Sequence, residues 1–470
     1  MTPPIIRPTV GRMEICMKIV VIGLGSIGRT VLKALSFEEQ IHSITVIDED
    51  KDKVESVIET YDISGVVGNG ACMEIQREAK VKGADLVIAL TNSDELNIFA
   101  CMVAKNLGVK STIARVRNPD YSQQIIEMKD ELGISMIVNP DKDTAQEIFN
   151  LIDLPSVTQM ENFAKGKVLL VEIVIDRDCT LVGETLISMN RRLTNRVLIC
   201  AVQRGDEVII PSGHFMFKAG DKIHFTAPAA NLGSFLSEIN LVKSPLKHIM
   251  IVGGGRVSFY LAEALSKKKR YKIKLLEKDK REAEKLAELL PKVTVVHGNG
   301  TRHGLLLEEG IEAMDAFVAL TDIDEENLIV SMFANKMQVK KTIAQIKSGD
   351  LFNIMNELGI DNDVSPKDIV ANRIISYIRA LANSRGSNVL TLYKLVNNQV
   401  EALEFAAKKK ERFYEKPLRE LKIKENCLVA CIIREGEVII PDGSSTIQLG
   451  DNVIVVTSHK NFDDLNDIIE

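Results

Sequence analysis

The chain repeats itself at a constant spacing of 230 residues, and this duplication limits its fold more than any other feature. The glycines Gly23 and Gly25 return at Gly253 and Gly255. Further matches at the same spacing are Gly68-Asn69-Gly70 with Gly298-Asn299-Gly300, Ala89-Leu90-Thr91 with Ala319-Leu320-Thr321, Asp94 with Asp324, Asn97 with Asn327, Thr112-Ile113-Ala114 with Thr342-Ile343-Ala344, 208–211 with 438–441, and Gly220-Asp221 with Gly450-Asp451. The chain is therefore two copies of one module, preceded by a short extension, and one fold must serve for both copies.

The first part of each copy alternates short apolar runs with helical patterns. In the first copy the predicted strands are 18–22, 44–47, 63–67, 85–90 and 111–116, and the predicted helices are 26–37 and 94–107. This β-α-β order is typical of a doubly wound, Rossmann-like parallel sheet. The predicted fold class is α/β, with one such sheet in each copy.

The texture changes from about residue 165, where Gly, Asp and Pro turns separate strand-like segments with little helix between them. These segments are 168–175, 197–202, 207–210 and 221–226. We expect a small β-rich α+β domain after each parallel sheet, and linkers near 139–160, 240–246 and 366–386, with helical segments after Pro140 and Pro366. The predicted domains are an extension at 1–16, Rossmann-like domains at 17–140 and 246–366, and β-rich domains at 160–244 and 387–470.

A glycine fingerprint connects the first predicted strand to the first predicted helix. In Gly23-x-Gly25-x-x-Gly28, the first glycine permits a tight turn, the second lets a pyrophosphate approach, and the third allows close packing of helix and strand. The helix N-terminus offers N–H groups and a partial positive charge. Asp48 ends the second strand, where a carboxylate can bind a ribose diol and disfavours NADP. A turn that serves packing alone is the alternative.

The second copy carries an altered version of this fingerprint. It reads Gly253-Gly254-Gly255-Arg256-Val257-Ser258, with Glu277 as the corresponding acid. Ser258 replaces the third glycine, a packing position, while Glu277 keeps the charge that a ribose requires. A second nucleotide site is predicted on these residues.

Composition narrows the classes of partner and compartment. The net charge is −6, which provides no general attraction for nucleic acid, and the basic run at 267–270 is expected to be a solvated corner. No apolar stretch has the roughly 18 to 20 residues that a membrane span needs, so a cytoplasmic location is expected. The seven cysteines form no dense framework, and reduced thiols are predicted.

These motifs together resemble those of a known family. Gly23-Leu24-Gly25-Ser26-Ile27-Gly28, Asp48, Gly68-Asn69-Gly70, the run from Ala89 to Asn97, and Ile113-Ala114-Arg115 resemble the N-terminal domain of RCK (regulator of potassium conductance) proteins. The β-rich part, with Val-Ile-Ile-Pro and Gly-Asp in both copies, resembles the RCK C-terminal domain. Two such pairs in one chain resemble the TrkA family, the regulatory subunits of bacterial Trk-type potassium uptake systems.

The resemblance implies roles for individual residues. The turn from Gly23 to Ile27, including Leu24 and Ser26, would hold a pyrophosphate, Asp48 the ribose, Thr91 and Asn92 the nucleotide, and Arg115 a phosphate. The expected nucleotide-binding residues also include Asn69 and, in the second copy, Gly253, Gly254, Gly255, Arg256, Val257, Glu277, Asn299, Thr321 and Asp322. Gln345 stands where Arg115 stands, which removes one charge-assisted contact, and Arg256 is a candidate substitute.

The resemblance also implies a function. The chain would be a peripheral subunit on the cytoplasmic face of the membrane, assembled as a ring, expected to be a homotetramer, beneath a TrkH-like potassium channel subunit. Binding of NAD or NADH, with ATP and ADP as alternatives, would gate potassium entry by allostery. The residues alone do not determine which of these nucleotides binds, which ligand opens the channel, or how many subunits form the ring. They also do not determine whether the protein starts at Met1 or at Met17.

Two other classes of function remain as alternatives. An NAD-dependent dehydrogenase would need an acid or base near the nicotinamide, and His214 and His224 have Ser444 and Ile454 as repeat counterparts, so we expect them to be surface or half-buried residues. A scaffold that no longer binds ligands is the third possibility, against which the intact first fingerprint argues.

The remaining reactive side chains predict no further chemistry. Cys427 and Cys431 are expected as buried thiols on one face of a strand, because side chains four apart point the same way. No His or Cys cluster has zinc spacing, and the acidic runs overlap the nucleotide motif or helix starts. No metal site and no catalytic residue are therefore predicted.

Overall fold

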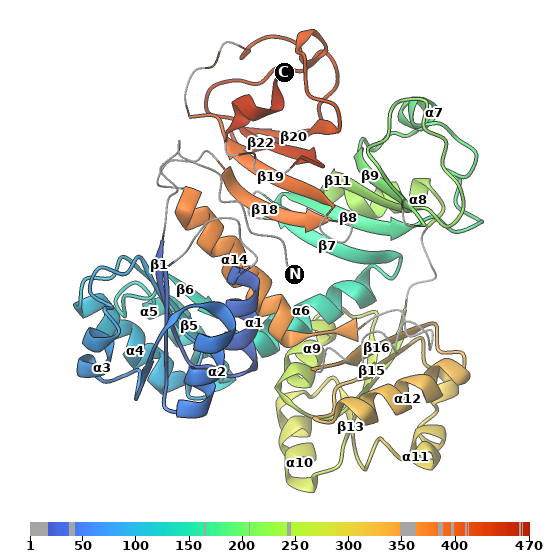
Figure 1. Cartoon of the computed structure of the whole chain (residues 1–470). Helices are drawn as coiled ribbons and strands as arrows, with labels where there is room; N and C mark the ends of the chain where they lie inside the picture. Colours follow the sequence, from blue (N-terminus) through green and yellow to red (C-terminus); the bar gives the residue numbers. More distant parts are fainter. Residues whose placement is uncertain are drawn as a thin grey trace, which may run out of the picture. The chain divides into compact units, whose positions relative to one another are not determined.

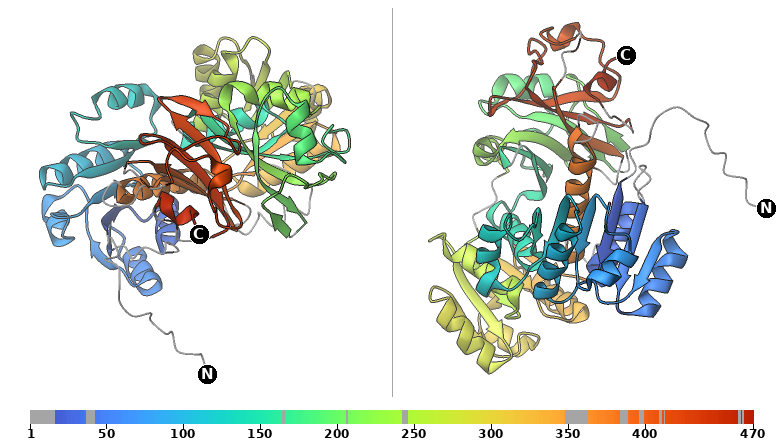
Figure 2. Two further views of the ribbon diagram at one scale, coloured as in Figure 1. Left: turned by 90° about the horizontal axis from the view of Figure 1, so that it is seen from above. Right: turned by 90° about the vertical axis from the view of Figure 1, so that its left-hand side faces the viewer.

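The computed structural model describes residues 17–36, 43–163, 166–205, 207–241, 246–347, 363–383, 389–395, 399–408, 411, 413–459, 462 and 464–470 (Figures 1 and 2). The predicted extension at 1–16 lies outside these residues. The described chain forms two units. One holds the residues up to Pro140 together with Val370–Ile375, and the other holds Asp141–Ile369 and Ser376–Glu470. Among the helices in these ranges, none is long and apolar enough to cross a membrane.

The first unit is built on a parallel sheet, as predicted, and this sheet has six strands. Its strands are β1 (Lys18–Ile22), β2 (Ser43–Asp48), β3 (Ser64–Val67), β4 (Leu86–Ala89), β5 (Ser111–Arg115) and β6 (Met136–Val138), in the order β3-β2-β1-β4-β5-β6. The order reverses between β1 and β4. In doubly wound sheets a ligand binds at this reversal, beyond the carboxyl ends of the strands.

Helices cover this sheet. They are α1 (Ser26–Ser36), α2 (Lys51–Tyr61), α3 (Met73–Glu78), α4 (Asp94–Asn106) and α5 (Pro119–Met128). Among them, α2, α4 and α5 begin at side-chain caps. Asp50 caps α2 and Ser93 caps α4, each accepting backbone N–H groups of the first turn. Every residue of β4 is buried, as expected for a central strand of a parallel sheet.

The second parallel sheet repeats the first. Its strands are β12 (His248–Val252), β13 (Lys272–Glu277), β14 (Thr294–His297), β15 (Ala316–Ala319), β16 (Lys341–Gln345) and β17 (Asp363–Val364), in the equivalent order β14-β13-β12-β15-β16-β17. Its helical segments are α9 (Arg256–Ser266), α10 (Lys280–Leu289), α11 (His303–Glu308), the 3₁₀ helix η3 (Ile311–Ala313) and α12 (Asp324–Lys336). Helix α14 (Pro366–Asn383) follows β17, and its residues Val370–Ile375 belong to the first unit. The duplication thus extends to strand order.

Helix α6 (Pro140–Asp153) begins after Asn139, as predicted, but the segment around it is not a linker. The apolar residues Ala145, Ile148, Leu151 and Ile152 of α6 are buried in the core of the second parallel sheet. At its other end, Asp153 binds Lys268 at 2.6 Å and Arg270 at 2.5 Å. The basic run at 267–270 is therefore not simply a solvated corner, because two of its cations hold this helix.

Each copy ends in a five-stranded antiparallel domain. The first contains β7 (Val157–Phe163), β8 (Val168–Val174), β9 (Leu198–Arg204), β10 (Glu207–Ile209) and β11 (Lys222–Pro228), with α7 (Leu186–Arg192), η2 (Ala229–Asn231) and α8 (Leu232–Glu238). The second contains β18 (Val389–Leu395), β19 (Val400–Ala406), β20 (Cys427–Arg434), β21 (Glu437–Ile439) and β22 (Asn452–Thr457), with η4 (Leu418–Glu420) and η5 (Leu465–Ile468). Strand β7 lies partly in the predicted linker.

The two antiparallel sheets pack against each other within the second unit (Figures 1 and 2). Their shared apolar core includes Leu170 and Ala201 from the first sheet and Ala402 and Ile454 from the second. The Oγ1 of Thr226 donates to the carbonyl oxygen of Ala430 at 2.9 Å across this interface. Both faces of each sheet are therefore buried, which explains why their strands lack a regular polar alternation.

Two expectations about side chains were wrong. The register of β20 against β22 shifts between Val429 and Cys431, and this bulge places Cys427 and Cys431 in different apolar clusters rather than on one face. Burial raises the pKa of Cys431 to about 12. His214 is exposed, as expected, but His224 is 1% exposed, with its Nε2 3.5 Å from the Glu172 carboxylate.

Candidate functional site

The glycine-rich turn after β1 combines tight packing with one open position. Gly23 has a φ of 97°, and a Cβ on it would lie 2.8 Å from the Thr91 nitrogen. A Cβ on Gly28 would lie 2.1 Å from the carbonyl oxygen of Gly23, whereas one on Gly25 would meet nothing within 4 Å. Packing explains the first and third glycines but gives no reason for Gly25, where a ligand pyrophosphate would approach.

Helix α1, which opens at this turn, has an N-terminus suited to an anion. The first turn of α1 carries no acidic residue, whereas the first turns of α2, α4 and α5 all do. The N–H groups there have no partners within the helix and carry the positive end of its dipole. A phosphate would therefore meet no competing carboxylate from this helix.

Asp48 lies at the carboxyl end of β2 and braces the turn. Its Oδ2 accepts the N–H of Leu24 at 2.6 Å, and its Oδ1 accepts the N–H of Asp50 at 3.0 Å. A carboxylate oxygen can accept a second hydrogen bond, so these contacts leave capacity for ribose hydroxyls. The same carboxylate can thus shape the turn and bind a ligand.

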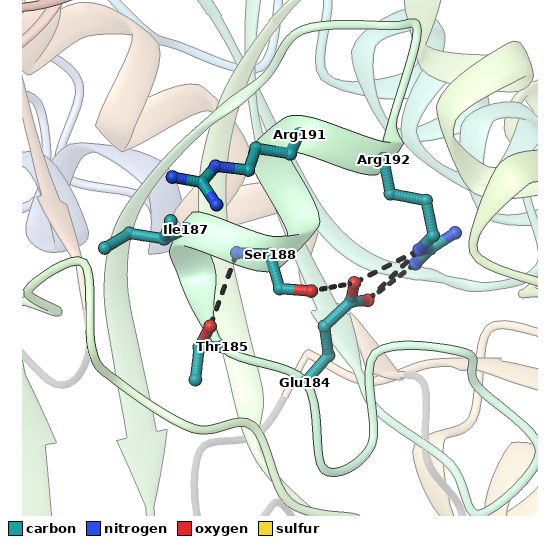
Figure 3. Close-up of a pocket in the computed structure, with 6 residues that line it drawn as sticks. All are labelled: Glu184, Thr185, Ile187, Ser188, Arg191 and Arg192. Atoms are coloured by element: carbon teal, nitrogen blue, oxygen red, sulfur yellow. Dashed lines mark hydrogen bonds and ion pairs between the residues drawn. The ribbon is translucent and has the colours of Figure 1, made fainter.

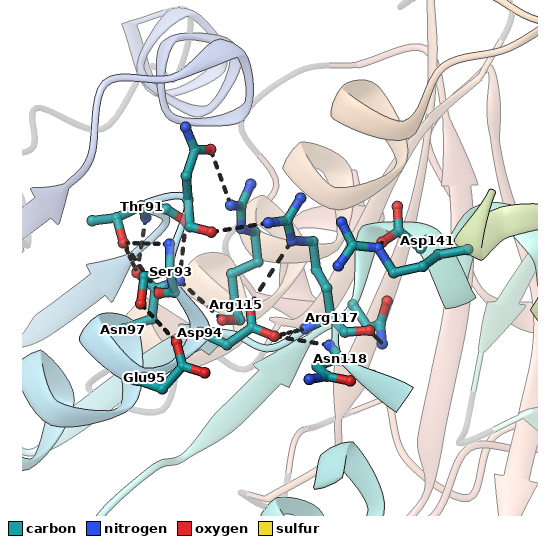
Figure 4. Close-up of polar contacts among 12 residues, drawn as sticks. Thr91, Ser93, Asp94, Glu95, Asn97, Arg115, Arg117, Asn118 and Asp141 are labelled. Atoms are coloured by element: carbon teal, nitrogen blue, oxygen red, sulfur yellow. Dashed lines mark hydrogen bonds and ion pairs between the residues drawn. The ribbon is translucent and has the colours of Figure 1, made fainter. Parts of the chain in front are cut away.

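A buried asparagine joins the ends of β4 and β5 (Figure 4). The Oδ1 of Asn97 accepts the N–H of Thr91 at 2.8 Å and its hydroxyl at 2.7 Å, while Nδ2 donates to the carbonyl oxygens of Thr91 and Arg115 at 3.1 and 3.0 Å. We did not predict Asn97 as a site residue, although its recurrence as Asn327 was a signal. It fixes the backbone on which Thr91 and Asn92 stand.

Arg115 and Arg117 lie at this edge of the sheet (Figure 4), and both donate hydrogen bonds to Asn92. Arg115 is buried and its Nη2 donates to the Asn92 Oδ1 at 3.2 Å, while the Arg117 Nη2 donates to the Asn92 carbonyl oxygen at 2.9 Å. The Asp94 Oδ2 accepts the N–H groups of Arg117 and Asn118 at 2.7 and 2.8 Å. Arg117 was also not predicted as a site residue, and it adds a second cation beside Arg115.

The second turn keeps the backbone of the first. Gly253 has a φ of 98°, a Cβ on Gly255 would again meet open space, and the first turn of α9 carries no acidic residue. Glu277 accepts the N–H of Gly254 at 2.6 Å and that of Asp279 at 2.7 Å, as Asp48 does in the first copy. The side chain of Val257 is buried.

Other predicted residues of the second copy face local partners. Asn299 accepts the N–H of Thr301 at 2.9 Å, just as Asn69 accepts that of Ala71 at 2.8 Å in the first copy, so both asparagines shape their own loops. The Thr321 N–H donates to Asn327 at 2.8 Å. Asp322 is exposed, with its carboxylate 3.5 Å from the Lys347 ammonium.

The second copy differs from the first at the positions that would contact the charged groups of a ligand. Ser258 is fully buried where the first copy has Gly28, and Gln345 is buried where it has Arg115. The candidate substitute, Arg256, has its Nε 3.1 Å from the Asp141 Oδ2. Its guanidinium is therefore already engaged by a carboxylate of α6.

These residues fit a dinucleotide in the first domain. The open face of Gly25, the neutral first turn of α1 and the Asp48 carboxylate match a pyrophosphate and a ribose diol in turn. The second turn has the same backbone conformation, but the described residues around it include fewer buried, positively charged side chains. No group of three or more metal-ligating side chains occurs in the ranges that the structure describes.

A separate depression lies on the first antiparallel domain (Figure 3). It is lined by Glu184, Thr185, Ile187, Ser188, Arg191 and Arg192. Glu184 accepts hydrogen bonds from Arg192 at 2.7 Å and from Ser188 at 2.8 Å, and Arg192 lowers the pKa of this carboxyl. None of the predicted nucleotide-binding residues lines it.

Comparison with known proteins agrees with this architecture. The TrkA-N domain matches residues 19–140 and 249–366, and the TrkA-C domain matches residues 170–240 and 403–470. The Trk system potassium uptake protein TrkA homolog 1 of Methanosarcina mazei is 33% identical over 446 residues, which cover 93% of this chain and 97% of the relative. The Trk system potassium uptake protein TrkA of Vibrio alginolyticus is 28% identical over 450 residues, 95% of this chain and 97% of the relative.

Solved structures share the fold at lower identity. The GsuK channel bound to NAD superposes with a TM-score of 0.63 and 16% identity, covering 94% of this chain and 77% of that one. The GsuK RCK domain gives a TM-score of 0.62 at 16% identity and covers 94% of this chain and 92% of the other. Tandem pairs of a parallel and an antiparallel domain are thus found in a known structural class.

Proposed function

The chain belongs to the TrkA family of proteins with tandem TrkA-N and TrkA-C domains, and from this premise we propose that it is a regulatory subunit that gates potassium uptake in response to a bound nucleotide. Curated relatives along almost its whole length are named Trk system potassium uptake proteins. The observation that carries the nucleotide-sensing part is the open position at Gly25 beside a helix N-terminus without acidic residues.

NAD or NADH is the proposed ligand of the first domain, with ATP or ADP as the other candidates. The turn of Gly23, Leu24, Gly25, Ser26 and Ile27 would hold the pyrophosphate. The N–H groups of Gly23 and Leu24 donate to Ile47 and Asp48, so the N–H groups of the later residues would receive the pyrophosphate. Asp48 would accept the ribose hydroxyls, and a carboxylate there repels the extra phosphate of NADP. Arg115, with Thr91 and Asn92, would complete the site at the ends of β4 and β5. The equivalent residues of the second domain form the second proposed site.

The partner proposed for this subunit is an integral-membrane potassium channel that resembles TrkH. The chain would form a homo-oligomeric ring on the cytoplasmic face of this channel. Exposed apolar side chains support self-assembly. Phe99 on α4 and Ile329 on α12 are each 55% exposed, and Met102 and Met332 follow one helical turn later on the same helices. The repetition of this pair at the spacing of 230 residues favours a surface that meets other copies of the chain.

A non-catalytic role is favoured over a dehydrogenase. His224 is 1% exposed within the antiparallel domains, and burial lowers its pKa, so it is poorly placed to exchange a proton with a substrate. A bound nucleotide would act by differing in affinity for two conformations of the ring, and couplings of about 1 to 3 kcal/mol are typical.

Calorimetric titration of the purified full chain tests the proposal. NADH, NAD, NADP, ATP and ADP would be compared on the unmodified protein, on Asp48→Ala and on Glu277→Ala. We expect saturable binding of NADH, NAD or an adenine nucleotide, weak binding of NADP, and loss of the first-site component in Asp48→Ala. The loss should reach at least tenfold in affinity, because about 1.5 to 3 kcal/mol accompanies hydrogen bonds to a charged group.

Three results would count against the proposal. The absence of binding by all five nucleotides would leave a ligand-blind scaffold as the better description. Oxidation of NADH with a small carbonyl compound would instead indicate a dehydrogenase. Unchanged binding in both acid variants, which should be checked for folding by circular dichroism, would place the nucleotide somewhere other than the two glycine turns.

A further inference from the structure

An ion pair links the glycine turn of the second parallel domain to helix α6. Arg256 directly follows Gly255 and opens α9, and its Nε lies 3.1 Å from the Oδ2 of Asp141. Asp141 is the second residue of α6 (Figure 4). The first copy has Ser26 in place of Arg256, so it has no equivalent cation in its turn.

The rest of α6 is held on the second domain by stronger means. Its apolar side is buried in the core of that domain, and Asp153 at its C-terminal end binds Lys268, Arg270 and the hydroxyl of Tyr271. Although burial favours the protonated acid, Lys268 and Tyr271 lower the pKa of Asp153. The ion pairs at the two ends are equally exposed, at 46% and 20% for Arg256 and Asp141 and at 44% and 19% for Lys268 and Asp153. The body of the helix is anchored by its apolar side and by Asp153, so it does not depend on the contact between Asp141 and Arg256.

A phosphate bound at the second turn would also bind the Arg256 guanidinium. A phosphate would approach on the open side of Gly255, at the N-terminus of α9 and one residue before Arg256. Arg binds phosphate through charge-assisted, bidentate hydrogen bonds, whereas the ion pair with Asp141 joins the Arg256 Nε to a buried carboxylate oxygen. Asp141 also lies in the first turn of α6, where the helix dipole stabilises a carboxylate without a cation. A phosphate at this turn would therefore compete with Asp141 for Arg256, and the helix dipole would offset part of the cost of leaving the Asp141 carboxylate without this cation.

We propose that Asp141 is a built-in competitor for the cation of the second nucleotide site, so that nucleotide phosphate and the N-terminal end of α6 bind Arg256 in mutual exclusion. This inference rests on the proposed nucleotide binding at the second turn. It adds a specificity element, because only a ligand with enough negative charge at the turn displaces Asp141. Gln345 makes this competition more influential, because the second copy lacks the cation that Arg115 provides in the first.

The chain itself connects the site of this competition for Arg256 to the first domain. Only Asn139 and Pro140 separate Asp141 from Val138, the last residue of β6. The Asn139 amide donates to the Arg117 carbonyl oxygen at 3.5 Å, and Pro140 has a restricted φ. These two residues are the covalent connection through which a change at Asp141 would reach the end of β6. Occupancy of the second site would in this way alter the strand end next to Arg117.

The test uses the full chain with Asp48→Ala, which removes the first site, and titrates ADP and NADH by calorimetry. Asp141→Asn should tighten binding about two- to fivefold, the range expected when a competing ion pair is removed. Asp143→Asn is the matched control, with the same change of charge in the same helical turn, and should change affinity less. Arg256→Ser, which installs the residue of the first copy, should weaken binding and abolish the effect of Asp141→Asn.

Hydrogen exchange provides a second readout. Amides 144–147 of α6 should exchange faster when ADP or NADH is added, and Asp141→Asn should show the faster exchange without ligand. Equal or weaker binding in Asp141→Asn would overturn the competition, since Asp141 would then position Arg256 instead. Binding to the unmodified protein but none to the Asp48→Ala background would overturn this inference and the second site together, while leaving the first site standing.

Discussion

Gly28 and Ser258 occupy the same place in the two parallel domains but meet different surroundings. A Cβ on Gly28 would lie 2.1 Å from a backbone oxygen, whereas the whole side chain of Ser258 is accommodated and fully buried. The helix therefore packs more closely on the turn in the first copy than in the second. Since close packing at this position brings the helix N-terminus to the pyrophosphate, the difference concerns ligand binding as well as stability.

The polar residues around the two turns are likewise partly shared and partly different. Both copies keep an acid that braces the turn, Asp48 or Glu277, and both keep the buried asparagine, Asn97 or Asn327. They differ at the cation, where Arg115 has become Gln345. The side chains that hold the backbone of the turn are thus shared, whereas the side chain that would contact the charge of a ligand differs. Duplication has kept one scaffold while the side chains proposed to contact a ligand have changed.

Exchanging the third residue of the fingerprint should give the largest difference between the copies. Gly28→Ser places atoms within 2.1 Å of the Gly23 carbonyl, which no rotamer can relieve, and should destabilise the first domain by about 4 kcal/mol. Ser258→Gly removes a buried hydroxyl but adds a glycine to a helix, and should change stability by only about 1 kcal/mol. Denaturant unfolding, with hydrogen exchange of α1 and α9 to identify the affected copy, measures both. Equal effects would mean that the two turns pack alike.

The buried asparagines should respond alike, which makes them a control for the comparison. Asn97→Ala would leave the Thr91 N–H and the Arg115 carbonyl without their partner, and Asn327→Ala would do the same to Thr321 and Gln345. We expect each substitution to destabilise its own domain by about 2 to 3 kcal/mol. The readout is the same unfolding and exchange experiment. A clearly larger effect in one copy would show that the shared network has also diverged.

The sequence predicted the architecture well because the duplication tested every local assignment twice. The strands from β1 to β5, helices α1 and α4, and the helices after Pro140 and Pro366 lie where the patterns placed them. The short strand β6 and helices α2, α3 and α5 were not predicted. Strand β6 has only three residues and α3 only six, and segments of this length carry little periodic signal. Length does not explain the omission of α2, which has eleven residues like the predicted α1.

The errors arose where distant parts of the chain meet. Helix α6 was assigned to a linker because its buried side is matched by residues about 100 positions away, such as Ile249 and Leu265. The bulge at Cys431 and the burial of His224 likewise depend on pairing with other strands. In the site, Arg117 was missed because it interacts through a backbone N–H with Asp94, a contact without a sequence pattern.

The cation difference should alter affinity rather than stability. Arg115→Gln makes the first site like the second and should weaken nucleotide binding about tenfold, as expected for loss of one charge-assisted contact. Gln345→Arg should strengthen the second site by a smaller factor, because burying the new charge opposes the gain. Calorimetry in the Glu277→Ala and Asp48→Ala backgrounds, respectively, isolates each site. Unchanged affinity in Arg115→Gln would remove the phosphate role that we assign to this arginine.

The smallest expected effect concerns the two antiparallel domains, which differ at a titratable position. His224 on β11 corresponds to Ile454 on β22. Burial lowers the pKa of His224 below its ordinary value of 6.5, Glu172 raises it in part, and Lys222 lowers it further. The folded state therefore holds the neutral imidazole, and the unfolded chain takes up the proton first as the pH falls.

It follows that stability should be constant above about pH 6.5 and should fall below it, with a limiting slope of about 1.4 kcal/mol per pH unit for one proton. His224→Ile, which installs the residue of the second copy, should remove this component while leaving the general acid dependence of the carboxylates. Denaturant midpoints of the unmodified and His224→Ile proteins between pH 5 and 8 measure the difference. Parallel pH profiles would show that Glu172 cancels the effect of burial, and the two antiparallel domains would then be electrostatically equivalent despite the substitution.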